Sequence, residues 1–193
     1  MGTKKIKLPQ PETPREQQGR DFFQTPKYAI ELLVPFIPSC KEIWEPACGH
    51  LKITNVLKKH GYKVLSSDIV YEVDGVVPFN FLTEWRTDVK NDVIITNPPY
   101  SLKKKFYERC KEYGLPFALL LPCDYSQWII DSIRYDGCEK VIPTRRINFI
   151  TPSGKTEETG GTANFHSMWL TWGFGLGKSE TFVELSLEDK KNI

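Results

Sequence analysis

Short apolar runs alternate with helical patterns along this sequence, and this alternation constrains the fold more than any other feature. The runs 93–96 (VIIT) and 117–121 (FALLL) are apolar or β-branched at successive positions, as are strands buried on both faces of a parallel sheet. A helical pattern lies between them and stops at Gly114, a residue type that often follows the last turn of a helix. The sequence therefore predicts an α/β fold with a doubly wound, mostly parallel sheet.

The same patterns place the other elements within one domain. We expect a seven-stranded sheet with a late antiparallel hairpin. Its strands are predicted at 42–47, 63–69, 92–96, 117–121, 140–142, 147–150 and 167–172, with 181–185 as a further candidate, and its helices at 26–35, 51–60, 101–113 and 125–135. A length of 193 residues suits one core, which we place at 21–186, between a flexible polar arm (1–20) and a tail (187–193). No separate target-recognition domain is expected.

Composition excludes several classes of protein. The 26 Lys and Arg residues nearly balance the 24 Asp and Glu residues, so the net charge of +2 neither indicates nor excludes a nucleic-acid partner. Five cysteines without a Cys-x-x-Cys pair, and three scattered histidines, argue against a disulfide framework and against a metal site. No apolar run approaches the roughly 20 residues that span a bilayer, and no secretory leader is recognised. We expect a cytoplasmic protein.

The segment Asn97-Pro98-Pro99-Tyr100 directly follows the 92–96 run. In a doubly wound sheet, ligands bind beyond the carboxyl ends of the strands, where the strand order reverses. The two prolines stiffen the backbone and lack N–H groups. The Asn97 side-chain oxygen and the Pro98 carbonyl could then accept both protons of one planar amino group, which frees its lone pair for attack on a methyl sulfonium, and Tyr100 offers a ring for stacking. The alternative is a rigid Pro-Pro turn that only caps a strand.

A second motif lies upstream, also at a predicted strand end. Its glycine allows a ligand to approach the backbone, and its residues are Glu45, Pro46, Ala47, Cys48 and Gly49. Asp68 follows Glu45 by 23 residues, at the end of the next predicted strand. An acidic residue at that spacing commonly accepts hydrogen bonds from ribose hydroxyls. A helix N-cap or a surface carboxylate is the alternative reading of Asp68.

With these motifs in this order, roughly residues 20–175 resemble the S-adenosylmethionine-dependent amino-group DNA methyltransferases, especially the small phage-type N6-adenine enzymes. Asn97–Tyr100 matches the catalytic tetrapeptide of that family, and 45–49 looks like its cofactor turn. The resemblance implies a Rossmann-like class I methyltransferase fold, S-adenosyl-L-methionine as cofactor, and a late hairpin that includes 146–149 and 166–169. It further implies that the cofactor contacts Phe23, Gln24, Thr25, Pro26, Asp68, Ile69, Asn80, Phe81 and Asn97.

Two positions depart from that family. Leu51 stands where the cofactor turn usually has a second glycine, and its side chain is expected to crowd the methionine part of the cofactor. Asn80 stands where an aspartate normally accepts a hydrogen bond from the adenine amino group of the cofactor, and its carbonyl oxygen can still accept.

The leading hypothesis is methyl transfer to N6 of adenine in DNA, with the base flipped out of the duplex. Phosphates would be held by basic residues near the site, or these residues form a solvated helix face. The candidates are Lys103, Lys104, Lys105, Arg145 and Arg146, together with His166, for which a structural hydrogen-bonded role is favoured. Alternatives are an RNA adenine or a protein glutamine as acceptor, and a catalytically degenerate cofactor-binding or nucleic-acid-binding subunit. A methyltransferase core without a separate target-recognition domain also suggests a helper or specificity subunit.

Two further patterns do not support a site. Cys123 follows Pro122 in a way that suggests a nucleophilic cysteine, but a small residue at a strand end is the favoured interpretation. The segment 154–156 (GKT) resembles the end of a P-loop, yet the first glycine of that motif is replaced by Phe149. Trp169 and Trp172 are expected in the core.

Overall fold

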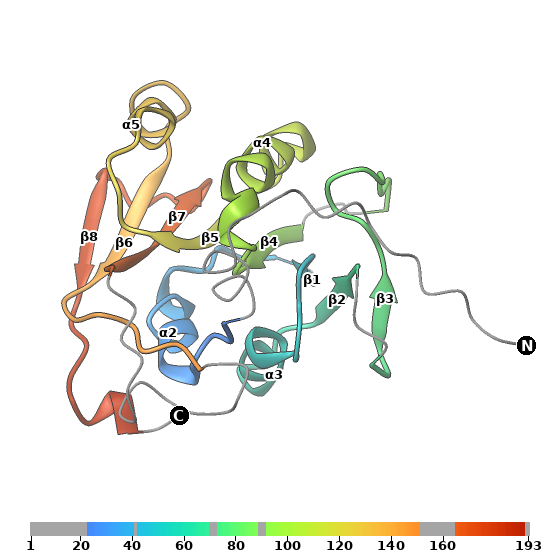
Figure 1. The fold of residues 1–193 in the computed structure, drawn as a ribbon, viewed down its shortest axis with the longest axis horizontal. Helices are drawn as coiled ribbons and strands as arrows, with labels where there is room; N and C mark the ends of the chain where they lie inside the picture. Colours follow the sequence, from blue (N-terminus) through green and yellow to red (C-terminus); the bar gives the residue numbers. More distant parts are fainter. Residues whose placement is uncertain (1–22, 41, 70–72, 89–91, 151–164, 192–193) are drawn as a thin grey trace, which may run out of the picture.

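Eight strands form one sheet in the order β3-β2-β1-β4-β5-β7-β6-β8 (Figure 1). This computed structural model describes residues 23–40, 42–69, 73–88, 92–150 and 165–191. The strands are β1 Glu42–Glu45, β2 Val64–Asp68, β3 Val76–Pro78, β4 Asp92–Thr96, β5 Phe117–Pro122, β6 Glu139–Pro143, β7 Ser167–Trp172 and β8 Glu180–Val183. Neighbours from β3 to β5 are parallel, whereas β7 runs antiparallel to both β5 and β6.

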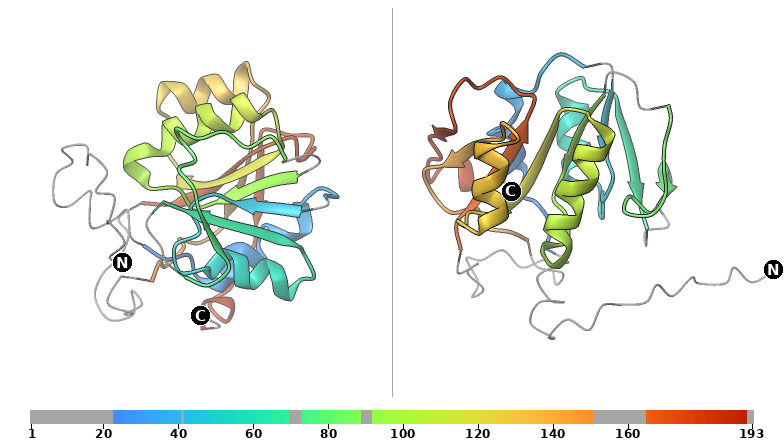
Figure 2. Two further views of the ribbon diagram at one scale, coloured as in Figure 1. Left: turned by 90° about the vertical axis from the view of Figure 1, so that its right-hand side faces the viewer. Right: turned by 90° about the horizontal axis from the view of Figure 1, so that it is seen from above.

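Helices cover both faces of this sheet. Figures 1 and 2 show α2 and α3 on one face and α4 and α5 on the other. The helical segments are α2 Lys27–Glu31, η1 Val34–Phe36, α3 Lys52–Lys59, η2 Tyr100–Leu102, α4 Lys103–Tyr113, α5 Gln127–Arg134 and η4 Asp189–Lys191. The predicted doubly wound, mostly parallel α/β fold is therefore confirmed.

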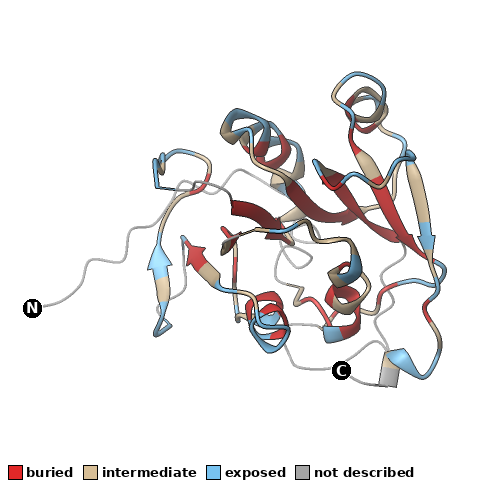
Figure 3. Cartoon of the chain, turned by 180° about the vertical axis from the view of Figure 1, so that it is seen from behind, coloured by how far each residue is buried: buried red, intermediate tan, exposed pale blue. Residues whose placement is uncertain are grey.

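The core is divided by the sheet into two layers, which explains the continuous apolar runs in the sequence. In β4, Val93 and Ile95 pack with α2 and α3, whereas Ile94 packs on the opposite side with α4 and α5. All five residues of β4 are buried. Figure 3 shows that the inner strands are buried, whereas the edge strands β3 and β8 carry exposed residues. A strand covered on both faces cannot alternate apolar with polar residues.

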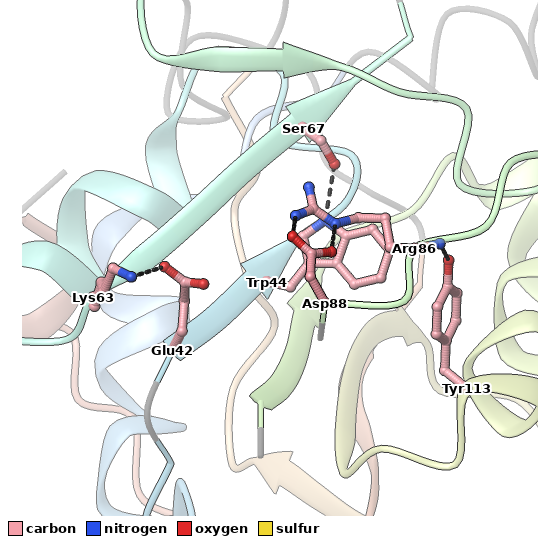
Figure 4. A network of polar contacts seen from close by, with 7 residues as sticks. All are labelled: Glu42, Trp44, Lys63, Ser67, Arg86, Asp88 and Tyr113. Atoms are coloured by element: carbon pink, nitrogen blue, oxygen red, sulfur yellow. Dashed lines mark hydrogen bonds and ion pairs between the residues drawn. The ribbon is translucent and has the colours of Figure 1, made fainter. Parts of the chain in front are cut away.

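Polar contacts fasten the loop after β3 to the α4 side of the sheet (Figure 4). The Trp44 indole N–H donates to the Ser67 hydroxyl at 2.9 Å, which joins β1 to β2. The Arg86 guanidinium lies 5.6 Å from the Trp44 ring centroid, and the Arg86 backbone N–H donates to the Tyr113 hydroxyl at 3.1 Å. A buried tryptophan thus has its polar N–H satisfied, as is usual.

Three expectations need correction. The sheet has eight strands rather than seven, because Val76–Pro78 pairs with β2 and Glu180–Val183 pairs with β6. Residues 147–150 do not form a strand: only Ile150 pairs, in an isolated bridge with Gln24. In the late hairpin, β7 pairs antiparallel with β6, which ends at Pro143, and not with residues 146–149. The short edge strand β3 was missed because it has only three residues, one of which is a proline.

Candidate functional site

The site residues gather at the point where the strand order reverses. From β1 the chain passes through α3 to β2 on one side, and it later returns to β4 on the other side of β1. Because β1, β2 and β4 are parallel, their carboxyl ends lie at one edge of the sheet. The turn after β1 (residues 46–51) and the segment Asn97–Tyr100 after β4 therefore flank the crevice in which doubly wound folds bind ligands.

Asn97 is held with a defined orientation. Its side-chain amide N–H donates to the Phe23 backbone carbonyl at 3.4 Å. Its other end, the carbonyl oxygen Oδ1, is buried and accepts no hydrogen bond from the residues that the structure describes. A buried acceptor without a partner is unfavourable by about 1–3 kcal/mol, and most such groups in native proteins are satisfied. Asn97 Oδ1 is therefore a candidate acceptor for a ligand N–H.

The segment that supplies this carbonyl is held by an isolated antiparallel bridge to Ile150. Gln24 and Ile150 exchange two backbone hydrogen bonds of 2.9 and 3.0 Å. Thr25 and Pro26 are buried, and α2 starts at Lys27. The structure thus brings the predicted motif 23–26 into contact with Asn97, more than 70 residues away in sequence.

Four aromatic rings from this segment and from Asn97–Tyr100, 149 and 165 pack against one another, and we refer to them as the aromatic cluster: Phe23, Tyr100, Phe149 and Phe165. The Tyr100 ring is edge-on to Phe149 and Phe165, at centroid distances of 6.2 and 5.6 Å. Phe23 and Phe149 are stacked at 6.2 Å with an interplanar angle of 26°. Phe165 was not singled out from the sequence, because no motif contains it, and only a pair of aromatic residues on either side of 151–164 hints at it.

The turn after β1 uses its polar groups internally. The Gly49 N–H donates to the Asp68 carboxylate at 2.9 Å, and the Cys48 N–H donates to the Ser67 carbonyl at 3.1 Å. The Leu51 N–H donates to the Cys48 carbonyl at 2.8 Å. Leu51 has φ of 58° and ψ of 24°, the left-handed conformation in which a side chain costs about 1–2 kcal/mol. Among the described residues other than glycine, it alone has a positive φ.

The Glu45 side chain is buried and bonded to α3. It is 1% exposed, and its carboxylate accepts hydrogen bonds from the Thr54 backbone N–H at 2.8 Å and from the Thr54 hydroxyl. The Thr54 hydroxyl also lies 2.7 Å from the Ser66 hydroxyl. Burial raises the pKa of Glu45 to about 8, although the two bonds from Thr54 oppose this rise. Glu45 therefore ties β1 to the first turn of α3.

The other predicted cofactor residues differ in accessibility. Ile69 is exposed, Ala47 and Gly49 are half-buried, and Pro46 is buried. The Asn80 side-chain oxygen accepts the Leu82 N–H at 3.1 Å, within its own loop. Phe81 is 2% exposed and packs against Trp44 and Phe106, in the core layer under α4. Phe81 is thus a core residue here.

The basic residues at the start of α4 have acidic neighbours. Lys103 pairs with Asp124 at 2.6 Å and Lys104 with Glu108 at 3.7 Å. Although burial raises the pKa of Asp124, hydrogen bonds from Lys103 and Ser126 hold it below its ordinary value. A phosphate would have to compete with these carboxylates for Lys103 and Lys104. Three other candidates are exposed: Lys105, Arg145 and Arg146.

His166 is fastened by the backbone rather than directed into a cleft. One ring nitrogen lies 2.6 Å from the Pro143 carbonyl, and the His166 carbonyl accepts the Cys123 N–H at 2.7 Å. Burial raises the pKa of Cys123, which opposes formation of a thiolate nucleophile. The contacts of His166 join the carboxyl ends of β5 and β6.

Within the described ranges, we find no cluster of three or more His, Cys, Asp or Glu side chains that could bind a metal ion. None of the helices described is both long and apolar enough to span a bilayer.

No family model matches this sequence, and a comparison with curated proteins gives no match either. Among solved structures, the chain is similar to a TehB-like SAM-dependent methyltransferase from Corynebacterium glutamicum, with 11% identity, a TM-score of 0.47, and coverage of 75% of this chain and 85% of that one. It is also similar to a SAM-dependent methyltransferase from Archaeoglobus fulgidus, with 10% identity, a TM-score of 0.47, and coverage of 76% of this chain and 92% of that one. A third similar structure is a glycopeptide N-methyltransferase complexed with S-adenosyl-L-methionine, with 13% identity, a TM-score of 0.43, and coverage of 82% of this chain and 82% of that one.

These structural neighbours are S-adenosylmethionine-dependent methyltransferases, the class that the sequence resemblance also names. With TM-scores below 0.5, the likenesses carry no argument about the activity of this chain.

Proposed function

We propose that this protein is an S-adenosylmethionine-dependent methyltransferase that acts on the exocyclic N6 amino group of adenine in DNA. The observation that carries the proposal is the buried Asn97 Oδ1, which has no partner among the described residues. It lies beyond the carboxyl end of β4, where the strand order reverses. A preorganised acceptor at that place suits a substrate amino group better than a structural turn, which would satisfy its own polar atoms.

In the proposed reaction, one amino proton of the substrate is donated to Asn97 Oδ1 and the other to the Pro98 carbonyl. Both bonds draw the nitrogen lone pair out of conjugation with the ring and direct it toward the methyl group. The cofactor, when bound, supplies that methyl group in an electrophilic form. The new N–CH₃ bond would form as the methyl–sulfur bond of the sulfonium breaks, with the electron pair leaving on sulfur as a neutral thioether, and the methylated amine would then release one proton to solvent. The Tyr100 ring offers a face for the base, and neighbouring rings of the aromatic cluster fix its orientation.

Three features near this crevice support the proposal that it binds an adenosyl group. Asp68 ends β2 beside the turn after β1, and a carboxylate there suits the two ribose hydroxyls. Ile69 follows it and is exposed, which suits the face of an adenine ring. The segment 23–26 contacts Asn97 through the Phe23 backbone carbonyl. We therefore propose that Asp68, Ile69 and this segment hold the cofactor, with no direct role for Glu45 or Phe81.

DNA is proposed as the acceptor because of the motif 23–26 and the exposed cations near the edge of the sheet. Arg145 and Arg146 follow β6, which is in the same sheet, and both are exposed. Such residues add a salt-dependent contribution to binding through phosphates. A base in a duplex would have to be flipped out, at a cost of a few kcal/mol.

The test is transfer of a labelled methyl group from S-adenosylmethionine to mixed-sequence DNA, RNA and protein in parallel. We expect label in DNA as N6-methyladenine, loss of that label with Asn97→Ala, and retention with Asn55→Ala, an exposed asparagine on α3. Label in RNA or protein but not in DNA would overturn the choice of acceptor.

A second candidate function is binding without catalysis, as a subunit of an active methyltransferase. It is favoured by the turn after β1, where Leu51 replaces a glycine and three N–H groups bond within the protein. Calorimetric titration with S-adenosylmethionine discriminates the two, because the proposed enzyme must bind the cofactor. Absence of binding at millimolar cofactor would favour this second function.

A further inference from the structure

We infer that the Phe23 backbone carbonyl is a positioning group for Asn97, and that the bridge between Gln24 and Ile150 holds this carbonyl in place. The inference rests on the proposed function, because it concerns which end of the Asn97 amide meets the substrate amine. It assigns to the segment 23–26 a role in orienting the reacting groups, beyond the cofactor contact expected from the sequence.

The need for a positioning group follows from the shape of an amide. The two ends of an asparagine side chain are nearly equal in size, and rotation about the terminal torsion is soft. If the amide were reversed, Asn97 would present an N–H donor to the N–H donors of the substrate. The hydrogen bond from Asn97 Nδ2 to the Phe23 carbonyl, at 3.4 Å, selects the orientation in which Oδ1 is the free acceptor.

The Phe23 carbonyl is itself constrained on two sides. The next residue, Gln24, exchanges hydrogen bonds of 2.9 and 3.0 Å with Ile150. The Phe23 ring stacks on Phe149, the residue before Ile150. The bridge and the stacked rings therefore fix the same short segment at the backbone and at the side chain. A change in the bridge should alter Asn97 without touching Asn97 itself.

This arrangement requires a donor at position 97 on the side of Phe23. A carboxylate there would place two acceptor oxygens against each other, and only the protonated carboxyl could restore the contact. We therefore expect Asn97→Asp to become active as the pH falls. Tyr100 and Lys103, which follow Asn97 in the sequence, and Asp124, which pairs with Lys103, are the same in both proteins.

The first experiment measures kcat at saturating cofactor from pH 6 to pH 8. We expect the wild type to change less than about twofold and Asn97→Asp to gain about tenfold or more at pH 6 relative to pH 8. A pH profile of Asn97→Asp that is parallel to the wild type would overturn the inference, because the carbonyl would then impose no protonation state on position 97.

The second experiment perturbs the bridge with a matched pair of variants. Ile150→Pro removes the N–H that donates to Gln24, whereas Ile150→Val keeps it and changes little volume. We expect Ile150→Pro to lower kcat by about 10-fold to 100-fold, with Ile150→Val within about twofold of the wild type. Equal kcat values for the two variants would contradict a positioning role for the bridge.

A third measurement separates this inference from the proposed function, since it needs no turnover. The carboxyl introduced by Asn97→Asp is labelled with ¹³C and titrated by NMR, alone and together with Ile150→Pro. We expect a pKa at least one unit above its ordinary value of about 3.9, and a smaller rise in the double variant. An ordinary pKa, or the same rise in both proteins, would overturn the inference even if the enzyme is active. The expected titration in a protein without methyl transfer would instead leave the positioning intact and reject the proposed activity.

Discussion

The turn after β1 and the segment after β4 begin at neighbouring strand ends, yet they treat their polar groups in opposite ways. In the turn, the N–H groups of Cys48, Gly49 and Leu51 all donate within the protein. In the segment Asn97–Tyr100, the Asn97 oxygen is buried without a partner among the described residues. The hydrogen bonds of the turn thus stabilise the fold, whereas the segment has one buried acceptor without a partner among the described residues. The contrast supports our proposal that the segment, rather than the turn, contacts the substrate amine.

The same contrast appears between two polar side chains, of which Glu45 is buried and Asn97 is half-buried. Glu45 is almost fully buried and bonded twice to Thr54, so its role is to connect β1 with α3. Asn97 uses one end for the Phe23 carbonyl and leaves the other end open. Substitutions on the two sides of the crevice should therefore separate activity from stability.

The largest effect is expected on activity for Asn97→Ala. Loss of a preorganised hydrogen-bonding group typically lowers kcat by about 10²–10³-fold. Folding should change little, because the variant loses one hydrogen bond but also removes a desolvated acceptor, so we expect less than about 1 kcal/mol in the free energy of unfolding. Single-turnover methyl transfer and urea denaturation measure the two quantities. A loss of several kcal/mol in the free energy of unfolding would show that Asn97, like Glu45, mainly stabilises the fold.

The next effect is a pH dependence of stability caused by Glu45. Its pKa is about 8 in the folded protein, against 4.5 for an ordinary glutamate, with burial as the main cause. The folded state then holds a proton that the unfolded state releases between these values, so stability falls as the pH rises from 4.5 toward 8 and levels off above. The change amounts to a few kcal/mol.

This pH dependence is measured by urea denaturation of the wild type and of Glu45→Gln at several pH values. Glutamine cannot titrate, and its side-chain oxygen can still accept from Thr54. We expect a flatter curve for Glu45→Gln and a higher stability than the wild type at pH 8. Parallel curves for the two proteins would mean that other groups cause the slope.

A smaller loss of stability is expected for Thr54→Val, which removes the hydroxyl between Glu45 and Ser66. A buried acceptor that loses its donor costs about 1–3 kcal/mol. Thr54→Ser retains the hydroxyl and serves as the control, with a loss of less than about 1 kcal/mol. Equal losses for the two variants would place the effect in packing rather than in the hydrogen bonds.

The smallest effect concerns the backbone of Leu51. In an ordinary helical position glycine is less stable than alanine by about 1 kcal/mol. At a left-handed position the order reverses, so Leu51→Gly should be about 1 kcal/mol more stable than Leu51→Ala. Thermal unfolding of the two variants gives the difference. If Leu51→Ala were more stable than Leu51→Gly, the backbone of Leu51 would not be strained. The left-handed residue in this turn would then need no functional explanation.

Sequence patterns predicted most of the sheet because its inner strands are covered on both faces. Asp92–Thr96 and Ser167–Trp172 form strands with the predicted bounds. Edge strands are harder to predict when they are short, and β3, which has only three residues including Pro78, is the example. The run 147–150 has strand-like residues, yet Ile147 and Phe149 are buried by packing rather than by pairing in the sheet.

For the candidate site, the sequence alone determined which residues lie at strand ends, since strand bounds and chain order suffice to place Asn97, Asp68 and the turn at one edge of a parallel sheet. Only the tertiary structure decided how their polar atoms are used. The partner of Asn97 is a backbone carbonyl from the N-terminal segment, and the partner of Glu45 is the first turn of α3. Because every residue has a backbone carbonyl, no pattern of side chains can predict which carbonyl accepts the hydrogen bond from Asn97. Whether a buried polar group is satisfied depends on distances between segments that are remote in sequence, and those distances exist only in the folded chain.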